Sequence, residues 1–287
     1  MTNLTLIIDA NALCHKAKHS LGDLTHETMH VGVIFGFLSQ ILRYAKEFET
    51  NKFAFVWDSK KSHRLKLFPA YKEARRSKEK TPEEIEIDKA AYEQFDRLYE
   101  EILPKLKVKN NFKFDGYEGD DLIASIIKCY PEEEFIIASG DEDLYQCLSD
   151  NVGMIKGKKL YTKKDFIKEY NIDPAQWSEV KAIAGCDTDG VPGVRGVGEK
   201  TAIKYLNDEL TPHLKGYKSI VSPEGKAIRN RNVPLVKLPF KDCPAIELQR
   251  QWGWSFNGFL DVCNNLNFQY FLKKENLTQW KQHLNML

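Results

Sequence analysis

Acidic residues follow three short apolar runs at the point where each run ends. The runs and their acids are Leu6–Ile8 with Asp9, Phe53–Trp57 with Asp58, and Phe135–Ser139 with Asp141 and Asp143. Runs rich in Ile, Val and Phe that alternate with longer helical segments are typical of buried parallel strands. Ligands bind at the carboxyl ends of such strands in open α/β sheets. We therefore expect carboxylates from three strands to face one crevice.

A fourth acidic motif, Tyr117-Glu-Gly-Asp-Asp-Leu122, adds Glu118, Asp120 and Asp121 to this group. Two like charges about 5 Å apart repel by roughly 3 kcal/mol even at an effective dielectric near 20, so such a cluster needs cations. Oxygen ligands alone select hard ions such as Mg²⁺. The implied chemistry is phosphodiester hydrolysis assisted by two ions about 3.5 to 4 Å apart, which activate a water and stabilise the departing oxygen.

Each of these acids also has a structural explanation when taken alone. An Asp after a strand caps a following helix well, and the acids at 118–121 could merely offset a helix dipole. Because the acids recur at comparable positions of an alternating α/β pattern, a shared metal site is favoured over separate structural roles.

The composition indicates a folded protein with one large or two modest domains. The 287 residues are 42% apolar and 29% charged. Six scattered cysteines without a CxxC pair indicate reduced thiols rather than disulfides or a zinc ribbon. The absence of a long apolar stretch and of a leader segment predicts a cytoplasmic protein with no membrane span. The histidines do not have the spacing of a zinc site, and no GxSxG motif indicates a covalent nucleophile.

The elements that must position the acids alternate up to about residue 155. We expect strands ending at Asp9, Asp58 and near Ser139, helices around 28–48, 82–103 and 118–129, and a hairpin through 152–161. Beyond Thr162 the pattern turns helical, with a helix at 174–184. This alternation predicts an α/β fold with a mostly parallel central sheet flanked by helices.

A basic segment lies between the second strand and the helix that follows. From Lys60 to Lys80 there are nine Lys or Arg against two acids, although the net charge of the whole chain is only +1. Phosphate contacts supply most sequence-independent nucleic-acid affinity, so this segment suits a polyanion led toward bound cations. A solvated face is the alternative. The segment also carries Phe68 and Tyr71, and we expect it to arch over the crevice.

A glycine-rich motif, Gly193-Val-Arg-Gly-Val-Gly-Glu-Lys-Thr201, opens a later helix. A Walker A loop is disfavoured because Glu199 separates Gly198 from Lys200. A helix-hairpin-helix fits better, since glycine amides, a helix N-terminus and a nearby Lys can bind a nucleic-acid phosphate. An ordinary glycine turn is the alternative. Asp187 and Asp189 precede the motif, and the helix at 174–184 would deliver them to the crevice.

These motifs together resemble the 5′ nuclease family, which includes flap endonucleases, phage 5′ exonucleases and the 5′ nuclease domain of bacterial DNA polymerase I. The similar segments run along nearly the whole chain. They are Ile8-Asp-Ala-Asn11, Trp57-Asp58 with Arg64, Tyr71-Lys-Glu-Ala-Arg75, Tyr117-Glu-Gly-Asp-Asp-Leu122, Ser139-Gly-Asp-Glu-Asp-Leu144, Asp189-Gly-Val-Pro-Gly193, Gly196-Val-Gly-Glu-Lys-Thr-Ala202 and Leu266-Asn-Phe268.

The resemblance implies a PIN-like catalytic domain at 1–162, with an arch at about 60–100, and a helical DNA-binding region at 163–287, with an H3TH-type helix-hairpin-helix at 174–208. It implies two Mg²⁺ ions, for which Mn²⁺ can substitute, and a K⁺ ion at the hairpin. The implied ligands are Asp9, Asp58, Glu118 and Asp120 for the first metal and Asp141, Asp143 and Asp189 for the second, with Asp121 in support. Lys72 and Arg75 would contact the scissile phosphate. The implied DNA contacts are Arg64, Tyr71, Arg76, Gly193, Gly196, Gly198, Lys200 and Thr201.

One position departs from the family pattern. Cys186 stands where the family usually has an Asp. A thiol is a poor magnesium ligand, so the outer part of the second site is expected to be weaker or to use Asp187 instead.

The resemblance implies a monomeric, metal-dependent hydrolase of DNA with 5′ ends, flaps or nicks, which acts in replication or repair and leaves a 5′-phosphate and a 3′-hydroxyl. RNA primers annealed to DNA are a further expected substrate. One rival is a protein of the same fold that grips branched DNA without cutting it, which the intact acids oppose and Cys186 faintly favours. Another is a PIN-type endoribonuclease, which the basic segment and the glycine hairpin oppose.

Overall fold

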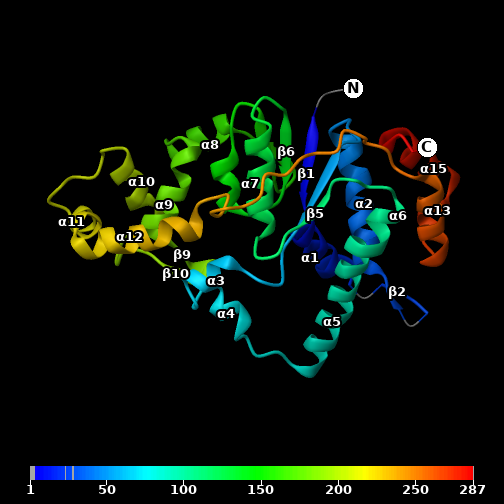
Figure 1. Ribbon diagram of the computed structural model, residues 1–287, viewed down its shortest axis with the longest axis horizontal. Coiled ribbons are helices and arrows are strands. Elements are labelled where there is room, and N and C mark those ends of the chain that lie inside the picture. The colour runs from blue at the N-terminus through cyan, green and yellow to red at the C-terminus, as the bar shows by residue number, and fades with distance from the viewer. Residues whose placement is uncertain (1–3, 23, 28, 287) are drawn as a thin grey trace.

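A six-stranded sheet in the order β5-β4-β1-β6-β7-β8 forms the centre of the molecule (Figure 1). The computed structural model describes residues 4–22, 24–27 and 29–286. Five strands are parallel, and only the β7–β8 pair is antiparallel. The strands are β1 (Thr5–Asp9), β4 (Phe53–Trp57), β5 (Asn111–Lys113), β6 (Phe135–Ala138), β7 (Val152–Lys156) and β8 (Lys159–Tyr161). The predicted α/β class with a mostly parallel sheet is confirmed.

Both faces of the sheet are covered, which explains why its strands are continuous apolar runs. Leu6 and Ile8 point into one core and Ile7 into the other. The first core lies under α1 (Ala10–Leu21), α2 (Gly32–Glu47), α5 (Pro82–Arg97), α13 (Phe256–Asn265), α14 (Gln269–Leu272) and α15 (Lys274–Leu284). The second lies under α7 (Gly119–Cys129), α8 (Lys163–Tyr170), α9 (Trp177–Ala184) and α10 (Glu199–Leu206).

Two predicted helices differ from expectation at their ends. The helix expected from residue 28 begins at Gly32, because β2 (Thr25–His26) and β3 (Met29–His30) pair as a hairpin before it; Thr28 itself lies outside the described residues. The helix expected at 82–103 is α5, which begins at a capping box between Thr81 and Glu84. It continues as a π-helical turn (Leu98–Ile102) and α6 (Leu103–Lys105).

The basic segment contains two short helices, α3 (His63–Leu67) and α4 (Glu73–Arg76). In Figure 1, α4 and the linker that follows it extend away from the sheet before α5 returns to the body. The segment therefore has the course of an arch, and its function in binding nucleic acid stays a prediction.

The chain crosses the molecule once more after α11 (Lys215–Val221) and α12 (Pro223–Val236). Residues 237–255, here called the strap, run from α12 to α13 (Figure 1). Hydrogen bonds fix it along the way: Leu248 N donates to the Tyr130 hydroxyl (2.8 Å), and Gln249 N donates to Asn110 Oδ1 (2.7 Å).

The helices after residue 162 do not share one core, because α15 packs against α2 whereas α12 packs against α9. None of the described helices is long and apolar enough to cross a bilayer.

Candidate functional site

Asp9 and Asp58 follow the adjacent strands β1 and β4, and backbone and hydroxyl donors fix both carboxylates. Asp9 accepts from Ala12 N and from the Ser139 hydroxyl, both at 2.9 Å. Asp58 Oδ1 accepts from Gly119 N at 2.7 Å. A Cβ at Gly119 would lie only 3.3 Å from that oxygen, so glycine lets α7 begin close to the carboxylate. Three strand ends and the start of α7 thus meet at one edge of the sheet.

Asp9, Asp58, Asp120 and Asp141 act on one another electrostatically. Burial, together with the Asp58 carboxylate, raises the pKa of Asp9 to about 7. Burial raises the pKa of Asp120 well above its usual value, and the charges of Asp141, Asp9 and Asp58 raise it further. Asp58 is an exposed residue, yet the loss of solvation around its carboxylate raises its pKa. The structure therefore brings these four residues into one crevice in which ionisation is unfavourable without a cation.

This donor set fits a hard divalent ion. Every candidate ligand in the group is a carboxylate oxygen, and hard cations prefer such ligands. A bound divalent ion would also offset the burial and the mutual repulsion that raise these pKa values. The fit supports a divalent-metal site, and the assignment of individual ligands stays a prediction.

Glu118 differs from its neighbours because cations surround it. Its Oε2 accepts from Lys72 Nζ at 2.8 Å and from the Tyr71 hydroxyl at 3.0 Å. Its Oε1 accepts from the Ser62 hydroxyl at 3.2 Å. Burial opposes ionisation of this carboxyl, but Lys72 and Arg64 outweigh it and lower the pKa of Glu118. Glu118 therefore ionises more readily than Asp9 and Asp120, whose pKa values are raised.

Lys72 is held in a left-handed backbone conformation, with φ of 53°. Its N–H donates to the carbonyl oxygen of Asp189 at 2.7 Å, which ties the start of α4 to the loop around Asp189. The Tyr71 hydroxyl donates to Asp189 Oδ2 at 2.9 Å, and an Arg75 guanidinium nitrogen lies 3.3 Å from Asp189 Oδ1. Such a conformation costs a residue other than glycine about 1–3 kcal/mol and persists where the surroundings impose it. Two cations of the basic segment are thus fixed at the rim of the acidic crevice.

A second ligand cluster consists of Asp143, Cys186 and Asp189, whose ligand atoms all lie within 4.8 Å of one another. Asp143 N donates to Asp141 Oδ1 at 2.9 Å, which places this cluster beside the first. Burial and the Asp141 charge raise the pKa of Asp143 to about 6. Asp187, predicted as an alternative ligand, is exposed and lies outside this cluster. Because one of its three donors is a thiol, the cluster as it stands does not fit Mg²⁺.

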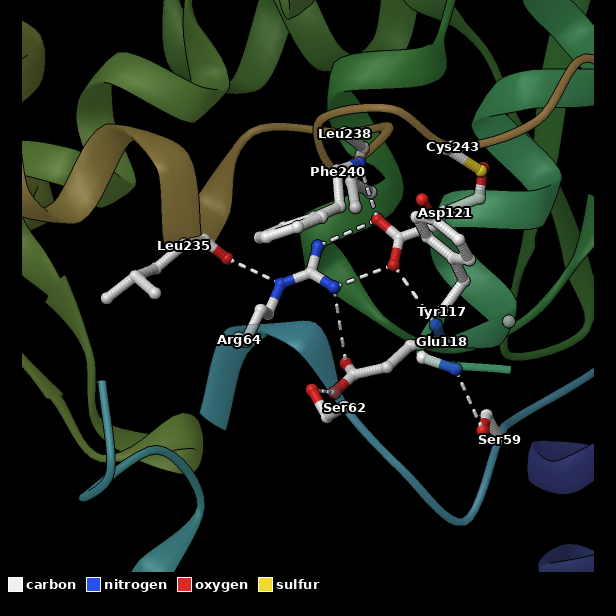
Figure 2. Close-up of polar contacts among 12 residues, drawn as sticks. Ser59, Ser62, Arg64, Tyr117, Glu118, Asp121, Leu235, Leu238, Phe240 and Cys243 are labelled. Carbon is white, nitrogen blue, oxygen red and sulfur yellow. Dashed lines mark hydrogen bonds and ion pairs between the residues drawn. The ribbon is translucent and has the colours of Figure 1, made fainter. Parts of the chain in front are cut away.

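The predicted DNA contact of Arg64 needs correction, because Arg64 is paired with Asp121 instead (Figure 2). The Arg64 side chain is only 3% exposed, and its guanidinium donates to both oxygens of Asp121, at 2.7 and 2.8 Å. Its Nε donates to the carbonyl oxygen of Leu235 at 2.8 Å. A buried guanidinium with these partners cannot reach a phosphate, and the Asp121 carboxylate is turned toward Arg64. Both residues support the start of α7.

Two strap and helix-end residues complete this support and were missed from the sequence. Phe240 N donates to Asp121 Oδ1 at 2.7 Å, and the Phe240 ring lies 5.1 Å from the Arg64 guanidinium carbon. Leu235 contributes its carbonyl oxygen. Because the polar groups are backbone atoms, no residue type at 235 or 240 signals the contact.

Lys181 of α9 was also missed. Its Nζ lies 3.7 Å from Asp143 Oδ1 and 2.8 Å from Glu199 Oε1, at the start of α10. It therefore connects the second ligand cluster with the glycine hairpin. A lone Lys within an amphipathic helix carries no sequence signal for this role.

The glycines of the hairpin have different surroundings. A Cβ at Gly193 would lie 2.0 Å from the Ala184 carbonyl oxygen, so this glycine permits close backbone packing. Gly196, with φ of 74°, and Gly198 face open space, and Lys200 is exposed nearby in the first turn of α10. Thr201 is half-buried. Among the predicted contacts of the hairpin, Gly196, Gly198 and Lys200 are thus the ones that a phosphate can approach.

Two other predicted DNA contacts lie nearer the acidic crevice. Tyr71 is buried, and its hydroxyl lies within hydrogen-bond distance of the Glu118 and Asp189 carboxylates rather than facing solvent. Arg76 is exposed, but it donates to the carbonyl oxygens of Pro69 (2.7 Å) and Tyr71 (3.1 Å). Both side chains shape the segment that carries Lys72 and Arg75.

Comparison with known proteins gives a consistent match. A family model described as the N-terminal resolvase-like domain of 5′-3′ exonuclease matches residues 4–171. The chain is 31% identical over 222 residues to the 5′-3′ exonuclease of Bacillus subtilis (strain 168), which covers 73% of this chain and 71% of that protein. It is 33% identical over 208 residues to the thermostable DNA polymerase I of Thermus aquaticus, and the matched region covers 71% of this chain. The match spans only 23–34% of the length of these DNA polymerase I relatives.

Solved structures agree with these matches. The T5 5′-exonuclease with bound zinc ions has a TM-score of 0.71 and 25% identity, over 82% of this chain and 90% of that one. Flap endonuclease-1 from Methanococcus jannaschii shares the fold, with a TM-score of 0.54 and 14% identity over 99% of this chain and 95% of that one. With its carboxylates gathered at the ends of parallel strands, and with the family model matching more than half its length, the chain belongs to the 5′ nuclease family of 5′-3′ exonucleases.

Proposed function

We propose that this protein is a Mg²⁺-dependent, structure-selective 5′ nuclease. It hydrolyses phosphodiesters in DNA at free 5′ ends, 5′ flaps or nicks, and it leaves a 5′-phosphate and a 3′-hydroxyl. The observation that carries the proposal is the convergence of Asp9, Asp58, Asp120 and Asp141 beside the cations Lys72 and Arg75. The named relatives, 5′-3′ exonucleases and DNA polymerases I, support this class of reaction.

One group of residues in the chain would hold metal, and another would hold the substrate. Asp9, Asp58, Asp120 and Glu118 would hold one divalent ion, which when bound supplies Lewis-acid stabilisation and lowers the pKa of water. Lys72 and Arg75 present positive charge at the rim, where negative charge grows on the phosphate during hydrolysis. The buried Arg64–Asp121 pair keeps the start of α7, and hence Glu118 and Asp120, in place.

The glycine hairpin would bind duplex backbone. Gly196 and Gly198 leave room for a phosphate, and Lys200 adds a positive charge. Mn²⁺ substituting for Mg²⁺, a K⁺ ion at the hairpin, cleavage of RNA primers on DNA and a monomeric state are further parts of this proposal.

Three end-labelled substrates test the proposal: a 5′ flap, a blunt duplex and a single-stranded RNA, each with Mg²⁺ or with chelator. We expect Mg²⁺-dependent cleavage of the flap and the duplex, with Asp120→Asn as the inactive control. Cleavage of RNA alone would instead identify an endoribonuclease. Tight binding of the flap without any product would identify a non-cleaving DNA-binding protein.

A further inference from the structure

The second ligand cluster has a donor set unlike that of the first. Asp9, Asp58, Asp120 and Asp141 offer only oxygen, whereas Cys186 offers sulfur beside the carboxylates of Asp143 and Asp189. Thiolate ligands select thiophilic metals, while Mg²⁺ demands oxygen. The two clusters therefore differ in the ion that each prefers.

The spacing of the donors suits a shared thiophilic ion. Cys186 Sγ lies 3.7 Å from Asp143 Oδ2, and the ligand atom of Asp189 lies within 4.8 Å of both. In a tetrahedral zinc site with ordinary Zn–S and Zn–O lengths, sulfur and oxygen lie about 3.5 Å apart. Only a small side-chain adjustment separates the observed distance from that value.

Neighbouring groups hold these donors and balance their charge. Tyr71 and Arg75 contact the Asp189 carboxylate, and Lys181 Nζ lies 3.7 Å from Asp143. The Thr188 hydroxyl lies 3.2 Å from Cys186 Sγ, where it can donate to a thiolate. The cations offset the negative charge of two carboxylates and a thiolate, which lowers the cost of holding three anions together.

An ion can reach the cluster although Cys186 itself is only 4% exposed. A cavity of about 550 Å³ lies beside it, lined among others by Lys181, Cys186, Thr188 and Lys200. The cavity extends from Cys186 to the start of α10, where the hairpin glycine Gly198 also lies.

We propose that Asp143, Cys186 and Asp189 form a site for a thiophilic divalent ion, Zn²⁺ or Cd²⁺, next to the oxygen-only site for a hard ion. Binding releases the thiol proton to solvent as the sulfur–metal bond forms. The inference rests on the proposed metal-dependent function and deepens it, because it assigns different ion classes to the two sites.

The experiment uses the whole chain without DNA and titrates it with Cd²⁺ in the presence of excess Mg²⁺. Thiolate-to-metal charge transfer gives an ultraviolet absorption band that oxygen ligands do not produce. We expect a band that saturates at one equivalent, is lost in Cys186→Ser and Cys186→Asp, and persists in the control Cys129→Ser. Cys186→Asp should weaken Cd²⁺ binding by at least about tenfold, since even partners outside the ligand set cost that much.

A second measurement does not depend on any variant folding. X-ray absorption at the zinc edge of the wild-type protein with one equivalent of Zn²⁺ should show one sulfur at about 2.3 Å. A shell of oxygen and nitrogen only, the absence of the Cd²⁺ band, or its persistence in Cys186→Ser would each overturn the inference. Because neither measurement uses nuclease activity, failure of the proposed function would leave their result unaffected, and the reverse also holds.

Discussion

Arg64 and Asp121 form a buried, two-pronged ion pair across 57 positions of the sequence. Asp121 also accepts from Glu118 N at 3.1 Å and from Phe240 N at 2.7 Å. The pair therefore joins α3, the start of α7 and the strap at one point. Since Glu118 and Asp120 flank that point, the geometry of the acidic crevice depends on a contact that does not face it.

Replacing Arg64 by Met should destabilise the protein by about 3–5 kcal/mol, because the Asp121 carboxylate would then be buried without a counter-charge. Adding Asp121→Asn should recover part of this loss, since the uncompensated charge disappears. Denaturant unfolding of both single variants and the double variant measures the coupling. A loss below about 1 kcal/mol in Arg64→Met would contradict a tightly coupled pair.

Lys72→Ala should lower the rate of flap cleavage by about 10²–10³-fold, the loss expected when a donor to transition-state charge is removed. Arg75→Ala should act in the same direction. Divalent-metal binding, measured by calorimetry, should remain detectable in both variants. Lys78→Ala is the matched control, because Lys78 is an exposed cation of the same segment. Equal rates for Lys72→Ala and Lys78→Ala would remove Lys72 from the mechanism.

The metal-free protein should lose stability as the pH rises toward neutrality because of Asp9. Its pKa is raised from 3.8 to about 7, so between these values the folded state keeps a proton that the unfolded state has lost. Stability from this group is therefore present below pH 3.8 and lost as the pH rises to about 7. Asp9→Asn, which keeps a helix-capping oxygen, should unfold at higher denaturant than wild type at pH 7.5, by on the order of 1–3 kcal/mol.

Unfolding in chelator at pH 4.5 and pH 7.5 isolates this effect as the difference between wild type and Asp9→Asn. Added Mg²⁺ should then stabilise the wild type more than the variant, which reverses the order. If the stability advantage of Asp9→Asn over wild type did not grow with pH, Asp9 would not be the cause of the pH dependence.

Lys200→Ala should weaken binding to all duplex sequences alike and lower the salt dependence of binding by about one ion. Gly193→Ala should act differently and lower the stability of the fold, because its Cβ would meet the Ala184 carbonyl oxygen. Fluorescence anisotropy at several salt concentrations, alongside thermal unfolding, separates the two effects. Lys128→Ala, at the opposite end of α7 from Glu118, is the control. An unchanged salt slope in Lys200→Ala would argue against a phosphate contact.

The sequence was sufficient to predict the strands and helices whose pattern of apolar side chains reflects their burial. Apolar runs marked β1, β4 and β6 because both faces of these strands are buried, and the acids after them marked the crevice. The late start of α2 was not predictable in the same way, since the β2–β3 hairpin is exposed and lacks an apolar pattern. The burial of Arg64 was hidden for a related reason: Leu235 accepts from Arg64 through its backbone oxygen, and Phe240 donates to the paired Asp121 through its backbone N–H. A basic residue among eight others looked like a surface charge.

The strap has a consequence for the order in which the protein matures. Arg64 finds its acceptor 171 positions later, at Leu235, and Asp121 finds its donor 119 positions later, at Phe240. A nascent chain that already carries Asp9, Asp58 and Asp120 therefore lacks the Leu235 and Phe240 contacts of the Arg64–Asp121 pair until residue 240 has been synthesised. The acidic crevice should thus reach its final geometry only after the strap has been synthesised.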